Sequence, residues 1–337
     1  MESTIKDIKR ETGLALSTIS KYLNGGNVRP ENKKKIDDAV RKLDYHPNEM
    51  ARGLITKKTR TIGFLLYDIS GTFAGILTHH VGTLLRQRGY GMIICDSSND
   101  KSVEEQNVKF LADKKVDGLL VVPVSSDDTF LEPIKKANIP IVTIDRKITG
   151  TQLDCVTIDN EEAAKNAVEY LIERGHERIA AIYSEEYTGK QRRDGYRKAM
   201  RSAGITISGE YEYHERLHSV SLGYNGMQKF LKLPKKSQPT AIFMSNYEVA
   251  LGVVMAINEA GISCPEDISL VGFDELTLTL VMKPKMTLMV QPMESIANEA
   301  VRILMSKLQN ENSAALQRVL LYASLNEGDS VRDLRKR

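Results

Sequence analysis

The sequence predicts an α/β protein in which a small three-helix, helix-turn-helix domain precedes a larger core of two doubly wound parallel sheets. Two observations predict this fold class. Short amphipathic helices joined by tight turns fill residues 4–43. After residue 61, near-continuous apolar runs alternate with helical stretches, which is typical of buried parallel strands with helical crossovers. The 337 residues suffice for one small domain and a larger one with two lobes.

The first and third helices have clear start and stop signals. Thr4 can cap the first helix, Asp7 completes a capping box with it, and Gly13 is placed to end it. The third helix begins at Pro30, a residue that suits the first helical position. The apolar faces comprise Ile5 and Ile8 in the first helix and Ile36, Ala39, Val40 and Leu43 in the third. These faces are expected to close a three-helix unit.

The second helix, from about residue 16 to 23, carries a face that suits DNA reading. Ile19 and Leu23 point one way, and the opposite face comprises Ser17, Ser20, Lys21 and Asn24. A small, polar and basic face on a short helix after a glycine turn is what major-groove recognition needs. The same face would also suit a helical subdomain that only meets water. This stretch alone leaves both interpretations open.

The charge distribution favours a nucleic-acid contact at one end of the chain. Residues 1–60 carry 14 Lys and Arg against 8 Asp and Glu, whereas the remainder carries 33 against 36. A basic segment on a mildly acidic body fits such a contact. Solvated helix faces would give the same asymmetry, so charge is supporting evidence only.

The cysteines and the apolar runs indicate the cellular compartment of the protein. The three cysteines are far apart and match no disulfide or zinc-ligand spacing, so neither is expected. No apolar signal segment or run of membrane-spanning length is present in the sequence. We therefore expect a cytoplasmic protein with no membrane partner and no metal.

The core pattern comprises two sets of strands. Apolar runs of the first set cover residues 61–67, 92–95, 116–124 and 139–144, with helices near 73–88, 103–115 and 129–137. Runs of the second set cover 156–158, 178–183, 240–244 and 268–273, with helices near 160–174, 190–203, 220–231 and 247–260. The expected divisions are 1–46 for the helical domain, 47–60 for a hinge helix and linker, and 61–337 for the core. Within the core, one lobe covers about 61–158 and 292–322, and the other about 159–291 and 323–337.

Further motifs complete a resemblance to a known family. They are TIKDI (4–8), STISKYLNG (17–25), Tyr-His-Pro-Asn (45–48), Ala-Arg-Gly-Leu (51–54) and Thr-Ile-Gly (61–63). With these motifs the chain resembles the lactose/galactose repressor (LacI/GalR) family, and the resemblance continues to about residue 325. It implies a periplasmic-binding-protein-like core whose chain crosses between the lobes three times. The helix near 294–308 and the strand 318–322 then return to the first lobe.

The resemblance implies a sequence-specific DNA-binding transcriptional regulator, expected to be a repressor. Such a protein binds a pseudo-palindromic operator as a homodimer, because one reading helix contacts only a few base pairs. Ser17 and Lys21 are expected to touch base edges, with Leu16 against a thymine methyl, while Leu54 of the hinge would wedge into a minor-groove step. The full set of expected DNA-binding residues is Thr4, Leu16, Ser17, Thr18, Ser20, Lys21, Asn24, Tyr45, Asn48, Ala51 and Leu54.

An effector site is expected where the polar strand ends of the two lobes face one another, since ligands of open α/β sheets bind there. The expected effector-binding residues are Ser70, Phe73, Asp96, Asp145, Arg146, Arg192, Asn246, Asp274 and Gln291. Carboxylates accept hydrogen bonds from hydroxyl groups, and Arg and Asn donate to them. The set therefore predicts a small polyhydroxylated effector, such as a sugar, sugar acid or sugar phosphate.

Each expected effector residue also has a simpler structural interpretation. Asp96 and Asn246 follow strands, so helix capping alone could explain them. Ser70 could be a turn residue, and Arg146 could form a surface ion pair. The resemblance tips the balance for a subset, which matches effector-contacting positions of the family. That subset is Asp145, Arg192, Asn246 and Asp274.

The chain departs from the family at three points. Residues 71–74 replace the common Asn-Pro-Phe-Phe, so one wall of the pocket differs. No tryptophan is present, which excludes a Trp-stacked sugar. Ala15 stands where the family usually has a serine cap, which should weaken the reading helix by about 1 kcal/mol.

Two other functions compete with this interpretation of the sequence. A sugar-converting enzyme is disfavoured, because the sequence has no GxGxxG after a strand, no phosphate-binding loop and no Ser/His/Asp or Cys/His constellation. We therefore expect no catalytic residues and no cofactor. A regulator whose main co-regulator is a phosphocarrier protein remains open, and neither the effector nor the direction of its effect can be read from the sequence.

Overall fold

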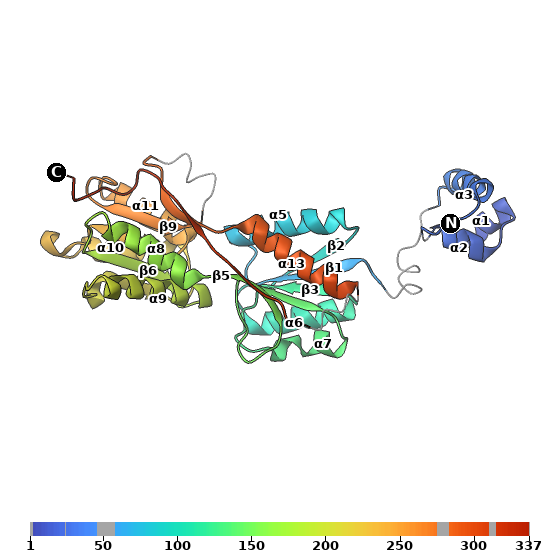
Figure 1. The fold of residues 1–337 in the computed structure, drawn as a ribbon, viewed down its shortest axis with the longest axis horizontal. Helices are drawn as coiled ribbons and strands as arrows, with labels where there is room; N and C mark the ends of the chain where they lie inside the picture. Colours follow the sequence, from blue (N-terminus) through green and yellow to red (C-terminus); the bar gives the residue numbers. More distant parts are fainter. Residues whose placement is uncertain (1–2, 24, 46–57, 275–282, 310–314, 337) are drawn as a thin grey trace. The chain divides into compact units, whose positions relative to one another are not determined.

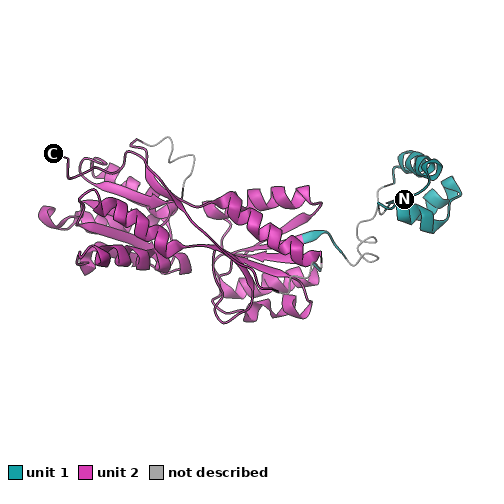
Figure 2. Cartoon of the chain, viewed as in Figure 1, with its two compact units in different colours: residues 1–61, 115–117 teal, residues 62–114, 118–337 magenta. Residues whose placement is uncertain are grey.

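The computed structural model describes residues 3–23, 25–45, 58–274, 283–309 and 315–336. The chain forms two compact units, residues 1–61 with 115–117, and residues 62–114 with 118–337 (Figure 2). The first unit is helical and the second contains two sheets, so the α/β fold class predicted from the sequence is confirmed.

The small unit consists of three helices, α1 (Ile5–Thr12), α2 (Leu16–Leu23) and α3 (Pro30–Lys42). They pack around a core of four buried side chains, Ile8, Ile19, Ile36 and Ala39. The Asp7 carboxylate accepts hydrogen bonds from the Thr4 backbone N–H (2.9 Å) and hydroxyl (2.7 Å) at the start of α1. Gly13 ends α1 at a φ of 67°, which lies in the left-handed region that glycine adopts without strain.

The first sheet of the core has the order β11-β5-β4-β3-β1-β2. Its strands are β1 (Thr61–Leu66), β2 (Gly91–Asp96), β3 (Gly118–Val121), β4 (Ile141–Ile144), β5 (Asp154–Ile158) and β11 (Arg318–Leu321). Helices α5 (Thr72–Gln87) and α13 (Met293–Leu308) cover one face, and α6 (Lys101–Asp113) and α7 (Glu132–Lys136) cover the other (Figure 1). We call this sheet with its helices the first lobe.

The second sheet has the order β12-β10-β9-β8-β6-β7. Its strands are β6 (Ile179–Ser184), β7 (Glu212–Glu215), β8 (Ala241–Met244), β9 (Ser269–Phe273), β10 (Thr287–Val290) and β12 (Ser324–Asn326). Its helices, which with the sheet form the second lobe, are α8 (Asn160–Ile172), α9 (Tyr187–Ser202), α10 (Val220–Leu231) and α11 (Tyr247–Glu259). The two sheets share one order, in which β1 corresponds to β6 and β4 to β9. The described chain passes between them three times, after β5, β10 and β11.

The sheets differ from the sequence pattern at three strands. The run 156–158 forms part of β5, which lies in the first sheet although it heads the second set along the chain. Strands β7 and β12 were not expected, because β7 reads Glu-Tyr-His-Glu and an edge strand needs no continuous apolar run. β12 pairs with β10 in antiparallel orientation, so the second sheet is not purely parallel.

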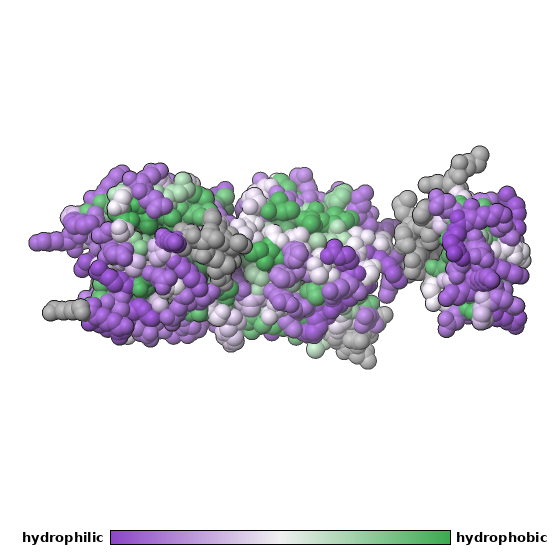
Figure 3. Space-filling model, turned by 90° about the horizontal axis from the view of Figure 1, so that it is seen from above, coloured by the Kyte–Doolittle hydropathy of each residue, from purple (hydrophilic) through white to green (hydrophobic). Residues whose placement is uncertain are grey.

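Exposed hydrophobic side chains are unevenly distributed. Among the described residues, the large exposed ones of the core are Ile69, Ile94, Phe110, Met255, Leu316, Leu320 and Tyr322. Only Leu16, which is 37% exposed on α2, belongs to the small unit. Figure 3 accordingly shows a mostly hydrophilic surface on the helical unit and larger hydrophobic areas on the core.

Close packing of α10 on α11 requires glycine. A Cβ at Gly252 would lie 1.9 Å from the Val220 carbonyl oxygen, and one at Gly223 would lie 2.0 Å from that of Val249. Both obstructing atoms are backbone atoms, so the helices would have to separate. These helices begin at the loops that carry cleft residues, so their spacing positions the site.

We predict that Gly252→Ala lowers the free energy of unfolding by about 2 kcal/mol or more, because overpacking displaces backbone. Gly75→Ala, on the exposed face of α5, is the control, since its Cβ would meet nothing within 4 Å. That change should be neutral or stabilising by about 0.5–1 kcal/mol. Urea denaturation of both variants measures the difference. Equal stabilities would contradict the packing argument.

Candidate functional site

The candidate DNA-reading surface lies on α2. Ile19 is buried and anchors the helix, whereas Ser17 and Lys21 are exposed on the opposite side. Ser17, Thr18 and Lys21 share a shallow concavity with four residues that follow α2 or begin α3, namely Asn27, Val28, Arg29 and Asn32. The sequence analysis did not single out these four, because they lie in a turn and on a helix start with no apolar pattern.

The remaining expected DNA-binding residues fall in three places. Thr4 is exposed at the start of α1, and Ser20 is half-buried on α2. Tyr45 packs partly buried against the core of the small unit, and this burial raises the pKa of its hydroxyl. The others, Asn24, Asn48, Ala51 and Leu54, lie outside the described residues, as does the expected hinge helix.

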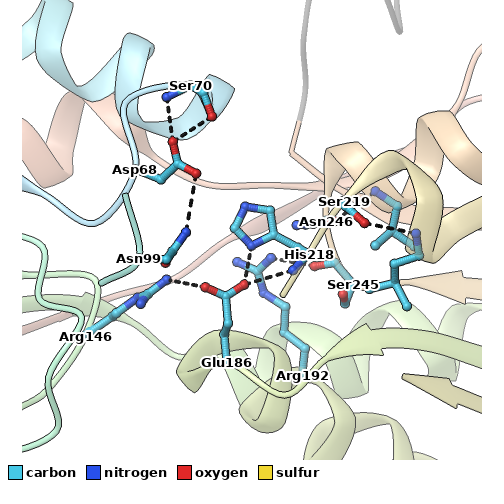
Figure 4. A network of polar contacts seen from close by, with 12 residues as sticks. Asp68, Ser70, Asn99, Arg146, Glu186, Arg192, His218, Ser219, Ser245 and Asn246 are labelled. Carbon is cyan, nitrogen blue, oxygen red and sulfur yellow. Dashed lines mark hydrogen bonds and ion pairs between the residues drawn. The ribbon is translucent and has the colours of Figure 1, made fainter. Parts of the chain in front are cut away.

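A cleft lies between the two lobes, with about 680 Å³ of empty space that is partly open to solvent. The structure brings seven of the expected effector residues to its wall: Phe73, Asp145, Arg146, Arg192, Asn246, Asp274 and Gln291. Ser70 and Asp96 do not line it. The Ser70 hydroxyl donates to Asp68 (2.6 Å; Figure 4), and Asp96 accepts from the Ile69 N–H (3.1 Å), so both stabilise local turns.

Asp145 and Asp274 occupy corresponding positions at the ends of β4 and β9. Both have left-handed backbone conformations, with φ of 67° and 68°, which cost a non-glycine residue about 1 kcal/mol or more. Their backbone N–H groups donate to the neighbouring strand, at Val156 (2.9 Å) and Met289 (2.8 Å). These bonds hold the turns that direct the two carboxylates into the cleft.

Arg192 of α9 is buried at the cleft wall. Its Nε donates to Asn160 Oδ1 (2.8 Å), and its Nη1 donates to the Ser245 carbonyl oxygen (2.5 Å). Nη1 also lies 4.0 Å from Asp274 Oδ2, and the guanidinium stacks 3.8 Å from the centre of the Phe273 ring. The side chain is thus held from four sides within the second lobe.

Arg146 connects the two lobes. Its Nη2 lies 3.2 Å from Oε1 of Glu186, which follows β6 in the second sheet, and Glu186 also contacts Nδ1 of His218 (Figure 4). The Arg146 guanidinium stacks 4.1 Å from the centre of the Tyr67 ring, and Tyr67 packs edge-on against His218. A buried charge network therefore crosses the cleft.

Three buried polar atoms near this network have no hydrogen-bond partner among the described residues. They are Gln291 Oε1, Asn160 Nδ2 and Arg146 Nε. Gln291 is itself tied to the site, because its Nε2 donates to Asp274 Oδ1 (2.7 Å). Unpaired buried polar groups are costly. Arg146 and Gln291 line the cleft, so their unpaired atoms are suited to hydrogen bonds with a bound ligand.

Some lining residues were missed by sequence reasoning. Tyr67, Thr188, His218 and Glu248 line the cleft, and Glu186 lies behind it. His218 follows strand β7. Because β7 is polar and contains no apolar run, the sequence did not predict where it ends. Asn246 illustrates two roles at once, because it lines the cleft while its side chain caps α11 by accepting from the Val249 N–H (3.0 Å).

Burial and pairing shift the pKa values of the network. Burial raises the pKa of Asp145 despite the opposing charge of Arg146. Burial alone would also raise the pKa of Glu186, but the hydrogen bond and charge of His218, with Arg146, outweigh it and hold this pKa at about 2. Burial would lower the pKa of His218, but the bond to Glu186 outweighs it and the net shift is upward.

These shifts define the pH range in which the pair stabilises the fold. The depressed pKa of Glu186 gives a contribution that is complete above its ordinary value of 4.5 and is lost as the pH falls toward 2. The raised pKa of His218 gives a contribution that is complete below its ordinary value of 6.5 and is lost as the pH rises through the folded-state value. The pair therefore contributes most between pH 4.5 and 6.5.

We predict that Glu186→Gln lowers the free energy of unfolding by about 3 kcal/mol near pH 5.5, because it leaves buried cations unpaired. The loss should shrink once the pH exceeds the raised folded-state pKa of His218, where that side chain becomes neutral. Glu185→Gln removes the adjacent, more exposed carboxylate and should cost less than about 1 kcal/mol. Denaturation across this pH range measures both, and a pH-independent loss for Glu186→Gln would contradict the assignment.

The fold and site together define a class of protein: a two-lobed ligand-binding core attached to a helix-turn-helix domain. A family model for bacterial regulatory proteins of the lacI family matches residues 4–48, and one for a periplasmic binding protein-like domain matches residues 168–331. The chain belongs to the LacI family of transcriptional regulators. The resemblance stated from the sequence motifs is therefore confirmed.

Curated relatives are similar over nearly their whole length. Catabolite control protein A of Priestia megaterium is 32% identical over 315 residues, covering 92% of this chain and 94% of that protein. The HTH-type transcriptional regulator RegA of Clostridium saccharobutylicum is 33% identical over 335 residues, covering 98% and 100%. The HTH-type transcriptional repressor PurR of Erwinia tasmaniensis is 31% identical, covering 98% and 97%.

Solved structures match the fold of the whole chain. The lac repressor dimer bound to operator and the anti-inducer ONPF superimposes with a TM-score of 0.85 at 22% identity, covering 98% of this chain and 100% of that one. The complex of the transcriptional regulator CelR with cellobiose has a TM-score of 0.72 at 25% identity and the same coverage. No helix among the described residues is both long and apolar enough to cross a membrane. In that part of the chain, no group of three or more His, Cys, Asp or Glu side chains could hold a metal ion.

Proposed function

We propose that this regulator binds a pseudo-palindromic operator as a homodimer, and that a small polyhydroxylated effector in the interlobe cleft controls its affinity for that operator. The observation that carries the proposal is the cleft wall, where carboxylates, amides and arginines from both lobes meet. Such groups suit hydroxyl-rich ligands. The CelR structure, whose ligand is cellobiose, supports a sugar-type effector.

The proposed DNA contacts are those expected from the sequence. Lys21 and Ser17 read base edges, Leu16 contacts a thymine methyl, and Thr4, Thr18 and Asn24 hold phosphates. Leu16 is 37% exposed on α2, so its side chain is accessible for contact with a thymine methyl. The divisions at residues 46, 60, 158 and 322, and the hinge roles of Asn48, Ala51 and Leu54, stay predictions.

The homodimer is supported by the edge of the first sheet. Strand β2 ends that sheet, and its Ile94 is 39% exposed, with Ile69 also exposed in the loop after β1. An uncovered edge with apolar side chains is suited to contact with a second copy. Within this proposal the protein acts in the cytoplasm by binding alone, with no catalysis and no cofactor.

We predict that the full chain selects palindromic duplexes from a random pool and that Lys21→Ala changes the selected half-site. Its side chain is proposed to read a base, so its loss relaxes specificity at one position by about 1–3 kcal/mol. Lys34→Ala, an exposed change outside the concavity, is the matched control and should leave the selected sequence unchanged. A uniform loss of affinity across all DNA sequences would show that Lys21 contacts a phosphate. If no sequence were selected, the operator proposal would be contradicted.

A further inference from the structure

The cations of the cleft are already paired with groups of the protein. Arg192 is bound by the Asn160 side chain and the Ser245 carbonyl and lies 4.0 Å from Asp274. Arg146 is bound by Glu186 and by the Pro123 carbonyl oxygen (3.3 Å). Both guanidinium groups also lie over aromatic rings, which cover one face of each. Neither arginine offers an open fork for a phosphate or carboxylate.

The carboxylates of the cleft exceed its cations. Asp145, Asp274 and Glu248 line the wall, and Glu186 stands behind it, against the two arginines and His218. With His218 charged, the described residues in and behind the cleft carry four negative groups and three positive ones. Glu248 forms no hydrogen bond or ion pair with the described residues, and its charge attracts Arg192 and His218 only through space. The field in the cleft therefore disfavours a further negative charge.

Among the described residues that line the cleft, the groups left for a ligand are acceptors on Gln291, Asp145 and Glu248 and one unpaired donor, Arg146 Nε. Gln291 is 6% exposed, lines the cleft, and keeps its Oε1 without a partner among the described residues. The carboxylate oxygens of Asp145 and Glu248 likewise accept only. Hydroxyl and amine groups supply hydrogen-bond donors, whereas phosphate and carboxylate groups add acceptors. The lining also includes apolar side chains, among them Ile76 and Met293.

A neighbouring cavity, unlike the cleft, is lined by two cations that lack an ion-pair partner among the described residues. It is lined by Lys101 and Arg216, which form no ion pair with the described residues, and by Lys190. This cavity and the cleft share only Arg146 among their lining residues. Lys101, Lys190 and Arg216 therefore do not line the cleft. The available positive charge thus lies outside the cleft.

We propose that the cleft selects uncharged or amine-bearing polyols and rejects their phosphorylated and carboxylate forms. This inference rests on the proposed function, in which a polyol is the effector, and adds the charge class of that ligand. It narrows the sugar, sugar acid or sugar phosphate expected from the sequence to the uncharged or amine-bearing members. The selecting residues are Glu248, Asp145 and Asp274, with Gln291 as an acceptor for a ligand hydroxyl.

The test is calorimetric titration of the full chain with matched sets of ligands. Each set contains a neutral sugar, its 2-amino-2-deoxy form, its 6-phosphate and its aldonic acid. The sets cover the glucose, galactose and mannose series. In the series that binds, the phosphate and acid should bind at least about tenfold more weakly than the neutral parent. A phosphate or acid that binds as tightly as its parent overturns the inference and leaves the polyol proposal standing. Absence of binding by every member overturns both.

A charge variant tests whether the cleft rejects phosphorylated ligands by electrostatic repulsion or by their size. Glu248→Gln removes one negative charge at nearly constant volume. It should reduce the affinity ratio between the neutral sugar and its phosphate, which we call the gap, several-fold. Glu259→Gln, on the exposed end of the same helix, is the control and should leave the gap unchanged. An unchanged gap in Glu248→Gln would overturn the role assigned to that carboxylate.

Discussion

The core depends on the burial of opposite charges between its two lobes. Arg146 follows β4 of the first sheet and Glu186 follows β6 of the second, and their side chains are 8% and 7% exposed at a distance of 3.2 Å. Removing such ions from water costs several kcal/mol each, so each needs a close partner. Each lobe supplies the partner that the charge of the other requires. The pair can form only where the strand ends of the two sheets face one another.

The same requirement connects the cleft to regulation. A ligand shifts a conformational equilibrium only through a difference in its affinity for the two states. The cleft wall takes Asp145 from the first lobe and Asp274 from the second, so a ligand that bridges them favours one arrangement of the lobes. The backbone strain at both aspartates is held by bonds to the adjacent strands, which keeps the two carboxylates in place before a ligand arrives.

Sequence reasoning succeeded where a local pattern carries the information. Apolar runs located the buried strands, and the rule that ligands bind beyond strand ends gave the set of candidate effector residues. The family resemblance then singled out Asp145, Arg192, Asn246 and Asp274, which the structure brings to one cleft. Sequence reasoning failed for β7 because an edge strand needs no apolar run, and His218 at its end was missed with it. Ser70 also follows a strand, but its hydroxyl is used by a local turn. Such differences depend on tertiary contacts that no single segment encodes.

The central claim is that the cleft and the operator-binding surface are energetically coupled. The most direct measurement is the affinity of the full chain for its selected operator with and without a saturating cleft ligand, paired with the affinity for that ligand with and without operator. The account predicts that both affinities change by the same factor, of about five or more, because binding free energies are reciprocally linked. A ligand that occupies the cleft while leaving operator affinity unchanged would contradict it.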